Sequence, residues 1–131
     1  MQNYIFDKVM EAGAEYDIKP FGIRAMDSMR LEKSYRLIPR EMSIEYSAYE
    51  SGLDRFVRLD KENDFIGKEA LSDWQERGAT NGFVTMEVLG VTDADARGSE
   101  AIYKDGKVVG RGTSGGYGWR CGKSLALGIV R

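Results

Sequence analysis

The sequence of 131 residues contains no histidine. Histidine is the side chain that most often acts as a general base near neutral pH, and it is the commonest protein ligand of metals. Its absence excludes Ser-His-Asp and Cys-His nucleophilic schemes and the usual zinc hydrolase sites. We therefore expect no hydrolase chemistry of these kinds and assign no metal-binding residue.

Cysteine is almost as scarce, because Cys121 is the only one. A single cysteine cannot form an intramolecular disulfide or a cysteine metal cluster, which fits a reducing compartment. We interpret Cys121 as a small buried or strand-end residue and not as a nucleophile.

The chain also lacks a long apolar run and a strong net charge. No segment approaches the roughly 20 apolar residues of a membrane helix, and the N-terminus has no signal-peptide pattern. A formal net charge of −2 gives no electrostatic reason to expect nucleic acid or acidic membranes as partners. We predict a soluble, cytoplasmic protein with neither kind of partner, folded as one domain or two small ones.

Helical patterns occupy the first part of the sequence. Apolar residues recur at intervals of three and four residues over 2–16, 20–36 and 67–77, which predicts a helix in each range. Ser47 and Glu50 have the spacing of a capping box, so a short helix is expected there too. We expect Ala70, Leu71 and Trp74 on the buried side of the third helix, with Gly78 as its C-cap.

Strand patterns dominate after about Ala79, apart from one earlier strand expected over 56–59. Strands are predicted over 83–89 and 124–130, and Asp105-Gly106 predicts a tight hairpin between 101–103 and 108–109. This order of helices followed by strands indicates an α+β fold, which we divide into residues 1–78 and 79–131.

Charged residues are dense around the second predicted helix. Asp27 and Arg30, and Glu32 and Arg36, have the i,i+3 and i,i+4 spacing of ion pairs. A solvated charged face beside an apolar stripe explains these charges as well as a functional role does. The paired carboxylates of Glu41 and Glu45 suggest acid–base chemistry, but we interpret them as part of a solvated surface stretch.

The glycine-rich residues 110–123 suggest a phosphate-binding loop, because they end in Gly122-Lys123. The spacing contradicts this reading, since Tyr117 occupies the position where a P-loop needs its first glycine. We interpret these glycines as residues that let strands bend and let Tyr117 and Trp119 pack closely.

The segment Asp27-Ser28-Met29-Arg30-Leu31-Glu32 followed by Tyr35 resembles the D-S-L-R-L-E-x-x-Y signature of the glycine-cleavage T-protein (aminomethyltransferase) superfamily. The longer string RAMDSMRLEKSYR is most similar to the folate domain of dimethylglycine and sarcosine dehydrogenases. Three further blocks, at 49–53, 64–71 and 113–118, agree with the superfamily in order and spacing.

The resemblance implies the end of a folate-binding domain over 1–78 and a truncated antiparallel β-barrel over 79–131. The superfamily's catalytic aspartate and its pterin-binding glutamate lie N-terminal to the signature, so no catalytic residue is assigned in this chain. The expected function is therefore that of a fragment, inert alone, of a protein that passes one-carbon units from a small N-methyl amine to tetrahydrofolate. The alternative is a non-catalytic ligand-binding or interaction module with the same fold.

Three residues are carried over as candidates for tetrahydrofolate binding. Tyr35 matches a tyrosine of the family's folate site, where it can stack on the pterin or donate a hydrogen bond. Met26 stands where aminomethyltransferases have an arginine next to the ligand, and Arg24 is a substitute cation. Side chains two positions apart on a helix point in directions that differ by about 200°, so Arg24 and Met26 should face different directions.

The resemblance also carries three structural expectations. Phe6 and Val9 should pack on a sheet, and Arg30 and Glu32 should form a structural ion pair. An incomplete barrel exposes unpaired strand edges, so we predict a homo-oligomer joined through residues 101–104, 107–115 or 124–130.

Overall fold

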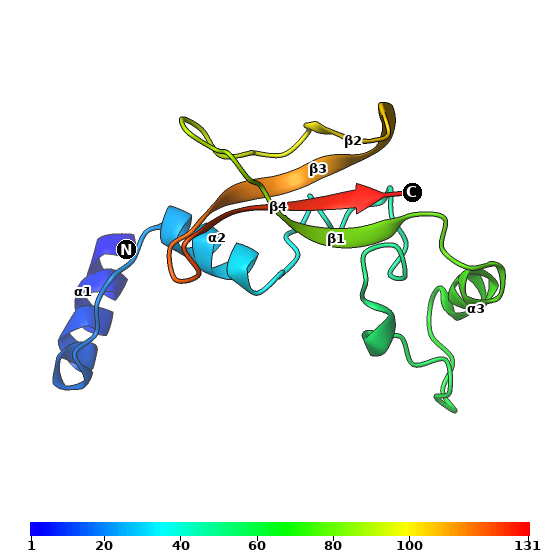
Figure 1. Ribbon diagram of the computed structural model, residues 1–131. Helices are drawn as coiled ribbons and strands as arrows, with labels where there is room; N and C mark the ends of the chain where they lie inside the picture. Colours follow the sequence, from blue (N-terminus) through cyan, green and yellow to red (C-terminus); the bar gives the residue numbers. More distant parts are fainter.

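The computed structural model describes residues 1–131 and has three α-helices, two short 3₁₀ helices and one four-stranded sheet (Figure 1). This content confirms the predicted α+β class. No helix has the length and apolar character needed to cross a membrane. The elements in chain order are α1 Gln2–Gly13, η1 Ala14–Tyr16, α2 Ile23–Glu32, η2 Asp54–Phe56, α3 Lys68–Arg77, β1 Gly82–Glu87, β2 Ala101–Lys104, β3 Lys107–Gly118 and β4 Lys123–Val130.

The sheet is entirely antiparallel, with the strand order β1-β4-β3-β2, and it does not close on itself. It therefore has the form predicted for an incomplete barrel. The hairpin between β2 and β3 turns at Asp105 and Gly106, whose φ angles are 51° and 73°. Two positive φ angles are what a two-residue hairpin turn of this kind requires, and the predicted hairpin is confirmed.

The strand order corrects two of the three predicted edges. β4 lies between β1 and β3, and β3 lies between β4 and β2, so residues 124–130 and 107–115 do not form the outer edges of the sheet. The sequence shows where strands occur but not their lateral order, which follows from long-range pairing. The outer strands are β1 and β2. Of the three segments predicted to form exposed edges, only residues 101–104, which form β2, lie at an edge of the sheet.

Helix α2 packs against one face of the sheet, on β3 and β4, and this contact forms the apolar core (Figure 1). Leu31 of α2 is buried with Leu125 and Leu127 of β4, and Phe83 packs against them. Gly116 permits the close approach, because a Cβ atom there would lie 3.3 Å from Leu31 Cδ1. The helix predicted over 20–36 is confirmed beside a sheet, although it is shorter than expected.

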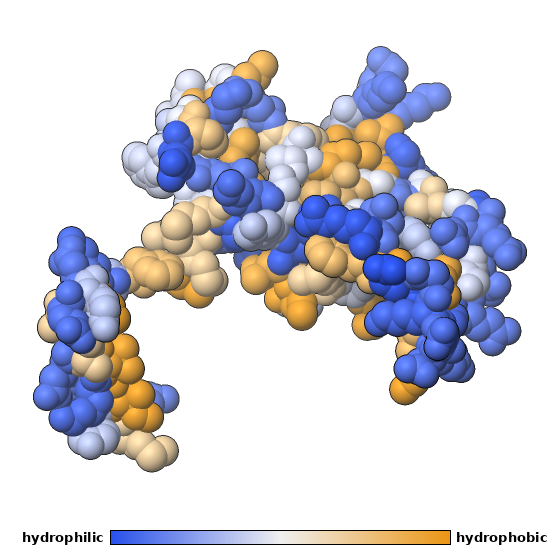
Figure 2. Space-filling view, turned by 90° about the horizontal axis from the view of Figure 1, so that it is seen from below, coloured by the Kyte–Doolittle hydropathy of each residue, from blue (hydrophilic) through white to orange (hydrophobic).

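Helix α1 stands apart from the sheet and has no buried residue (Figure 1). The expectation that Phe6 and Val9 pack on a sheet is wrong, since their exposed fractions are 54% and 50%. Figure 2 shows apolar side chains along one side of this helix. An amphipathic pattern predicts a helix with an apolar face, but it does not identify what covers that face.

The segment between α2 and β1 is less regular than predicted. Residues 56–59 form no strand, because η2 ends at Phe56 and Val57 follows it as its C-cap. No buried residue lies on α3: Ala70 is exposed, and Leu71 and Trp74 are half-buried. Gly78 does end this helix, with φ 77°.

The predicted capping box forms without a helix. Ser47 N donates to Glu50 Oε2 at 3.0 Å and Glu50 N donates to Ser47 Oγ at 3.2 Å, but residues 47–50 only form a turn. The buried Glu50 carboxylate also accepts hydrogen bonds from Thr80 Oγ1 at 3.3 Å and Asn81 Nδ2 at 2.7 Å. These contacts fix the turn to the residues that enter β1.

Replacing Leu127 by alanine should lower the free energy of unfolding by about 2 to 5 kcal/mol, because it leaves a cavity at a fully buried position in the core. Urea unfolding measures the loss. Val108→Ala is the control, since Val108 is exposed and its truncation should change stability by no more than about 0.5 kcal/mol. Equal losses in the two variants would contradict this assignment of the core.

Glu50 should make stability depend on pH. Its burial alone would raise the pKa of the carboxyl group, but the hydrogen bonds from Ser47, Asn81 and Thr80 outweigh burial and hold the pKa below 4.5. A carboxyl group with a lowered folded-state pKa stabilises the fold above its unfolded-state pKa, and this contribution disappears as the pH falls through the folded value.

We expect Glu50→Gln to be less stable than the unsubstituted chain at neutral pH by about 1 to 3 kcal/mol. The difference should shrink as the pH is lowered below 4.5. Urea unfolding over this pH range measures it, with Glu62→Gln as the exposed control. A constant difference over the whole range would rule out titration of Glu50 as its cause.

Candidate functional site

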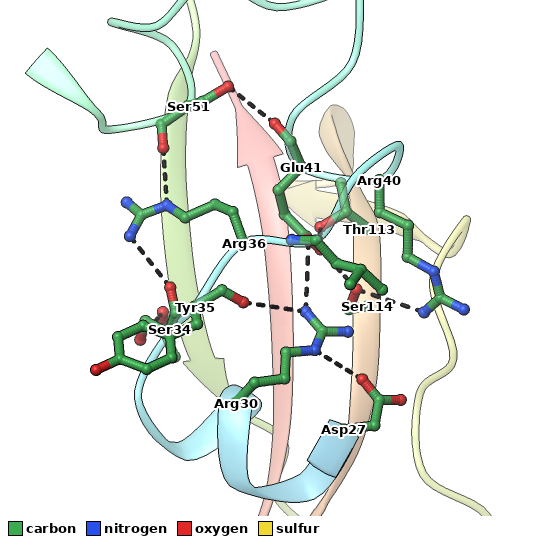
Figure 3. Close-up of polar contacts among 12 residues, drawn as sticks. Asp27, Arg30, Ser34, Tyr35, Arg36, Arg40, Glu41, Ser51, Thr113 and Ser114 are labelled. Carbon is green, nitrogen blue, oxygen red and sulfur yellow. Dashed lines mark hydrogen bonds and ion pairs between the residues drawn. The ribbon is translucent and has the colours of Figure 1, made fainter. Parts of the chain in front are cut away.

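Arg30 connects α2 to the chain that follows it (Figure 3). Its Nε donates to Asp27 Oδ1 at 2.6 Å, and its Nη1 donates to the Tyr35 carbonyl oxygen at 3.3 Å and to Glu41 Oε2 at 3.4 Å. The side chain is only 9% exposed, and its Nη2 is buried without a hydrogen-bond partner. The predicted pairing of Asp27 with Arg30 is confirmed.

Glu41 is fully buried, so its interpretation as part of a solvated stretch was wrong. Its Oε2 also accepts a hydrogen bond from Leu37 N at 2.8 Å, and its Oε1 accepts from Thr113 Oγ1 and Ser114 Oγ, both at 2.6 Å (Figure 3). The two hydroxyl groups come from β3, more than 70 residues later in the chain. Only the fold brings them to Glu41, so no local pattern in the chain signals this contact.

Arg36 holds the same segment from its other side. Its Nε donates to the Ser51 carbonyl oxygen at 2.8 Å and its Nη2 to the Gly52 carbonyl oxygen at 3.0 Å, while its guanidinium lies 3.8 Å from the centre of the Phe83 ring. Burial, followed by the charge of Arg55, lowers the pKa of Arg36, although an arginine remains charged. Arg36 is therefore committed to the backbone and the core, and its predicted pairing with Glu32 is wrong.

Glu32 accepts hydrogen bonds from Arg120 N at 2.7 Å and Cys121 N at 3.3 Å. It forms no ion pair with Arg30, so that expectation is also wrong. Its actual role is to anchor the turn between β3 and β4 against the end of α2. Cys121 lies in this turn, exposed and close to the start of β4, which agrees with the strand-end reading.

One side of α2 borders a groove of about 600 Å³, which we call the α2 groove. Two of the three residues predicted to bind folate, Met26 and Tyr35, line it together with Met29. Trp119, from the turn between β3 and β4, forms another wall and is 80% exposed. The groove thus combines flexible thioether side chains with two aromatic rings, a surface suited to a flat organic ring.

Arg24, the third predicted residue, lies on a separate pocket of about 410 Å³, which we call the loop pocket. The pocket is bordered by α2, residues 93–97, and residues 115–117 of β3. Arg24 and Met26 therefore line different cavities, as their spacing on a helix predicts. Trp119 lines both cavities, and it meets Tyr117 edge-to-face with 5.0 Å between ring centroids, which confirms the expected close packing.

Two parts of the chain match known protein families. Residues 1–61 match the GCVT N-terminal domain, and residues 81–131 match the glycine cleavage T-protein C-terminal barrel domain. The chain is 42% identical over 126 residues to mitochondrial dimethylglycine dehydrogenase of Homo sapiens, an alignment covering 96% of this chain and 14% of that protein. It is 38% identical to an aminomethyltransferase of Thermotoga neapolitana and 34% identical to one of Desulfitobacterium hafniense. The chain spans about a third of the aminomethyltransferases and about a seventh of the dehydrogenase.

Glu41→Gln should destabilise the fold by about 3 to 5 kcal/mol, because it removes the buried carboxylate that pairs with Arg30, whose other ionic partner, Asp27, is partly exposed. Thermal and urea unfolding measure the effect. Glu45→Gln is a matched control from the same segment, since Glu45 pairs with Arg111 at an exposed position and contributes no more than about 1 kcal/mol. If the Glu45 variant lost as much stability as the Glu41 variant, the buried contact would not be the one that holds this segment.

Proposed function

Because the chain belongs to the glycine-cleavage T-protein (aminomethyltransferase) superfamily, we propose that it forms the folate-facing portion of a protein that passes one-carbon units from N-methyl amines to tetrahydrofolate. Under this proposal, residues 1–78 complete a folate-binding domain and residues 79–131 begin the C-terminal barrel. The names of its relatives, dimethylglycine dehydrogenase and aminomethyltransferase, support this substrate class.

The observation that carries the proposal is the grouping of Met26, Tyr35 and Trp119 around the α2 groove. Its volume of about 600 Å³ lies within the range of small-molecule sites. Thioether and aromatic side chains offer a pterin ring dispersion and stacking contacts. Lys33 and Arg120 also border the groove and supply positive charge for the carboxylates of a folate tail. Tetrahydrofolate supplies the amine nitrogens that accept the one-carbon unit.

We propose that the chain alone is catalytically inert. Glu32, the one carboxylate that lines the groove, accepts hydrogen bonds from two backbone N–H groups on its Oε1. Glu41 is fully buried and accepts hydrogen bonds from four donors. A general base needs a lone pair directed at the substrate, whereas the contacts of these two carboxylates hold them against the turn before β4 and inside the protein. Under the alternative proposal, a non-catalytic binding module, the same groove holds a ligand without a reaction.

The cellular location of the chain and the association of its copies are proposed from the sequence. The human relative is named as mitochondrial, so the cytoplasmic location predicted from the sequence stays a prediction for this chain. Of the three segments predicted to join copies through a strand edge, only β2 is an outer strand.

Tetrahydrofolate should quench the fluorescence of Trp119. Trp74→Phe leaves Trp119 as the only tryptophan of the chain, so the signal then reports from the wall of the α2 groove. We expect saturable quenching, and Tyr35→Ala in this background should weaken binding by about three- to tenfold through the loss of a stacking contact.

Tyr16→Ala is the control for this titration, because Tyr16 is exposed in η1 and does not line the groove. In the reciprocal variant, Trp119→Phe, the remaining Trp74 should respond little. Unchanged Trp119 fluorescence at saturating tetrahydrofolate would contradict the proposed folate surface, and formation of one-carbon product by the chain alone would contradict its inertness.

A further inference from the structure

The two outer strands of the sheet differ in how well they are protected. β2 has only four residues, carries a bulge between Ile102 and Tyr103, and ends in a turn flanked by Lys104 and Lys107. Short length, bulges and lysines are features that keep an edge strand from pairing with another chain. β1 has six residues, a regular register with β4, and neither proline nor lysine. β1 is therefore the less protected edge.

Half of the residues of β1 turn their backbone groups away from β4. Val88 N, directly after the strand, donates to the Ser124 carbonyl oxygen at 2.9 Å. In an antiparallel pair, hydrogen-bonded residues alternate with residues whose backbone groups point the other way. Counting back from Val88, every second residue of β1 bonds to β4, and the other three turn their N–H and C=O groups outwards. These three residues are Phe83, Thr85 and Glu87.

The outward backbone groups of β1 have no partner within the chain. No hydrogen bond of a turn, loop or cap uses the N–H or C=O of these three residues. Where hydrogen bonds do occur, they involve side chains: Thr85 Oγ1 lies 2.7 Å from Ser34 Oγ, and Glu87 Oε2 accepts from Lys123 Nζ at 2.7 Å. Both Thr85 and Glu87 are exposed. The edge therefore presents a row of donors and acceptors that a further strand can satisfy.

A second copy of β1 fits this row when the two strands run antiparallel about a two-fold axis at Thr85. Thr85 then opposes Thr85 of the second copy, and Phe83 of each copy opposes Glu87 of the other. In this register every outward N–H group of one strand meets an outward C=O group of the other. A shift by one residue would place outward groups opposite groups that already bond to β4, so the backbone itself selects the register.

The side chains of β1 also suit this register. On one face of the sheet the two threonines oppose each other, a favourable cross-strand pair. On the other face Val84 opposes Met86, so two apolar pairs form. Glu87 is the only charged residue of β1, and it opposes Phe83, whose ring centre lies 3.8 Å from the Arg36 guanidinium. Each acid thus approaches a positive charge of the other copy and not a second acid.

We propose that β1 joins two copies of the chain into a symmetric dimer, in which the two four-stranded sheets continue into one another. The same strand serves on both sides of the contact, so the assembly closes at two copies. β2 is the outer strand that the sequence predicted as an edge, whereas this contact lies on the other outer strand. No residue of β1 lines the α2 groove, so the dimer is independent of the proposed function.

The two-fold axis permits a test by charge at position 85. Thr85→Lys and Thr85→Glu each place two like charges directly opposite one another in the dimer, which destabilises the contact. In sedimentation equilibrium, we expect the unsubstituted chain to form a dimer and each variant to dimerise about tenfold or more weakly. An equimolar mixture of the two variants should recover the dimer, because a lysine then opposes a glutamate.

Two control variants separate repulsion from damage to the fold. Tyr103→Lys adds the same charge at an exposed position of the other outer strand, and it should leave the dimer intact. Thr85→Ala loses the contact with Ser34 but adds no charge, so this variant should also remain dimeric. If Thr85→Ala weakened the dimer as much as Thr85→Lys does, charge repulsion across the axis would not be the cause and the proposed register would be wrong.

Amide hydrogen exchange followed by NMR locates the contact. The N–H groups of Phe83, Thr85 and Glu87 should exchange about tenfold or more slowly in the dimer than in the Thr85→Lys chain. Those of Val84 and Met86, which bond to β4, should change much less. The proposal is overturned by a monomer at every concentration, by a dimer that Thr85→Lys leaves intact, by a mixture that does not recover the dimer, or by protection that appears in β2 and not in β1.

Discussion

The contact between the guanidinium of Arg30 and the carboxylate of Glu41 holds three parts of the chain together. Arg30 belongs to α2, Glu41 belongs to the segment after it, and the hydroxyl groups that complete the carboxylate's contacts belong to β3. A buried ion pair need not stabilise a fold more than apolar residues of the same size, but each charge requires the other once both are buried. The main effect of this contact is therefore to specify how α2, the segment that contains Glu41 and the sheet are arranged. Its net contribution to stability is secondary.

Arg30 also relates the two cavities on either side of α2. Its Nε holds Asp27, a residue of the loop pocket, and its Nη1 holds the backbone of Tyr35, a residue of the α2 groove. Both cavities are thus shaped by a residue whose polar contacts lie within the protein. A substitution of Arg30 would disturb both surfaces through their shape, and loss of ligand binding in such a variant would not identify Arg30 as a ligand contact.

Local patterns predicted the elements that short-range forces determine. The apolar spacing over 20–36 predicted α2, and Asp105-Gly106 predicted the hairpin between β2 and β3. The spacing of Arg24 and Met26 predicted that they face different directions, and they line different cavities. These features depend on neighbours a few residues apart in the chain, so the sequence contains them directly.

Features that depend on distant contacts were missed. In the sequence, Glu41 looks like any other acid of a charged segment, because Thr113 and Ser114 reach it only in the folded chain. The pattern of α1 predicts an apolar face but not the residues that would pack on it. The insertion of β4 between β1 and β3 likewise follows from pairing across the whole chain. The loop pocket was missed for the same reason, since Arg24 and Asp95 are about half the chain apart.

The hydrogen bonds of the acids near α2 also determine what these acids can do. A carboxylate offers about four lone-pair directions, and the Glu41 carboxylate uses four in contacts with Arg30, Leu37, Thr113 and Ser114. Asp27 is held by Arg30 and Glu32 by the turn before β4, so the acids near the α2 groove serve the fold. Under the proposed function, proton transfer between an amine and tetrahydrofolate would therefore fall to a group other than these carboxylates, whose contacts instead hold α2 and the sheet in place.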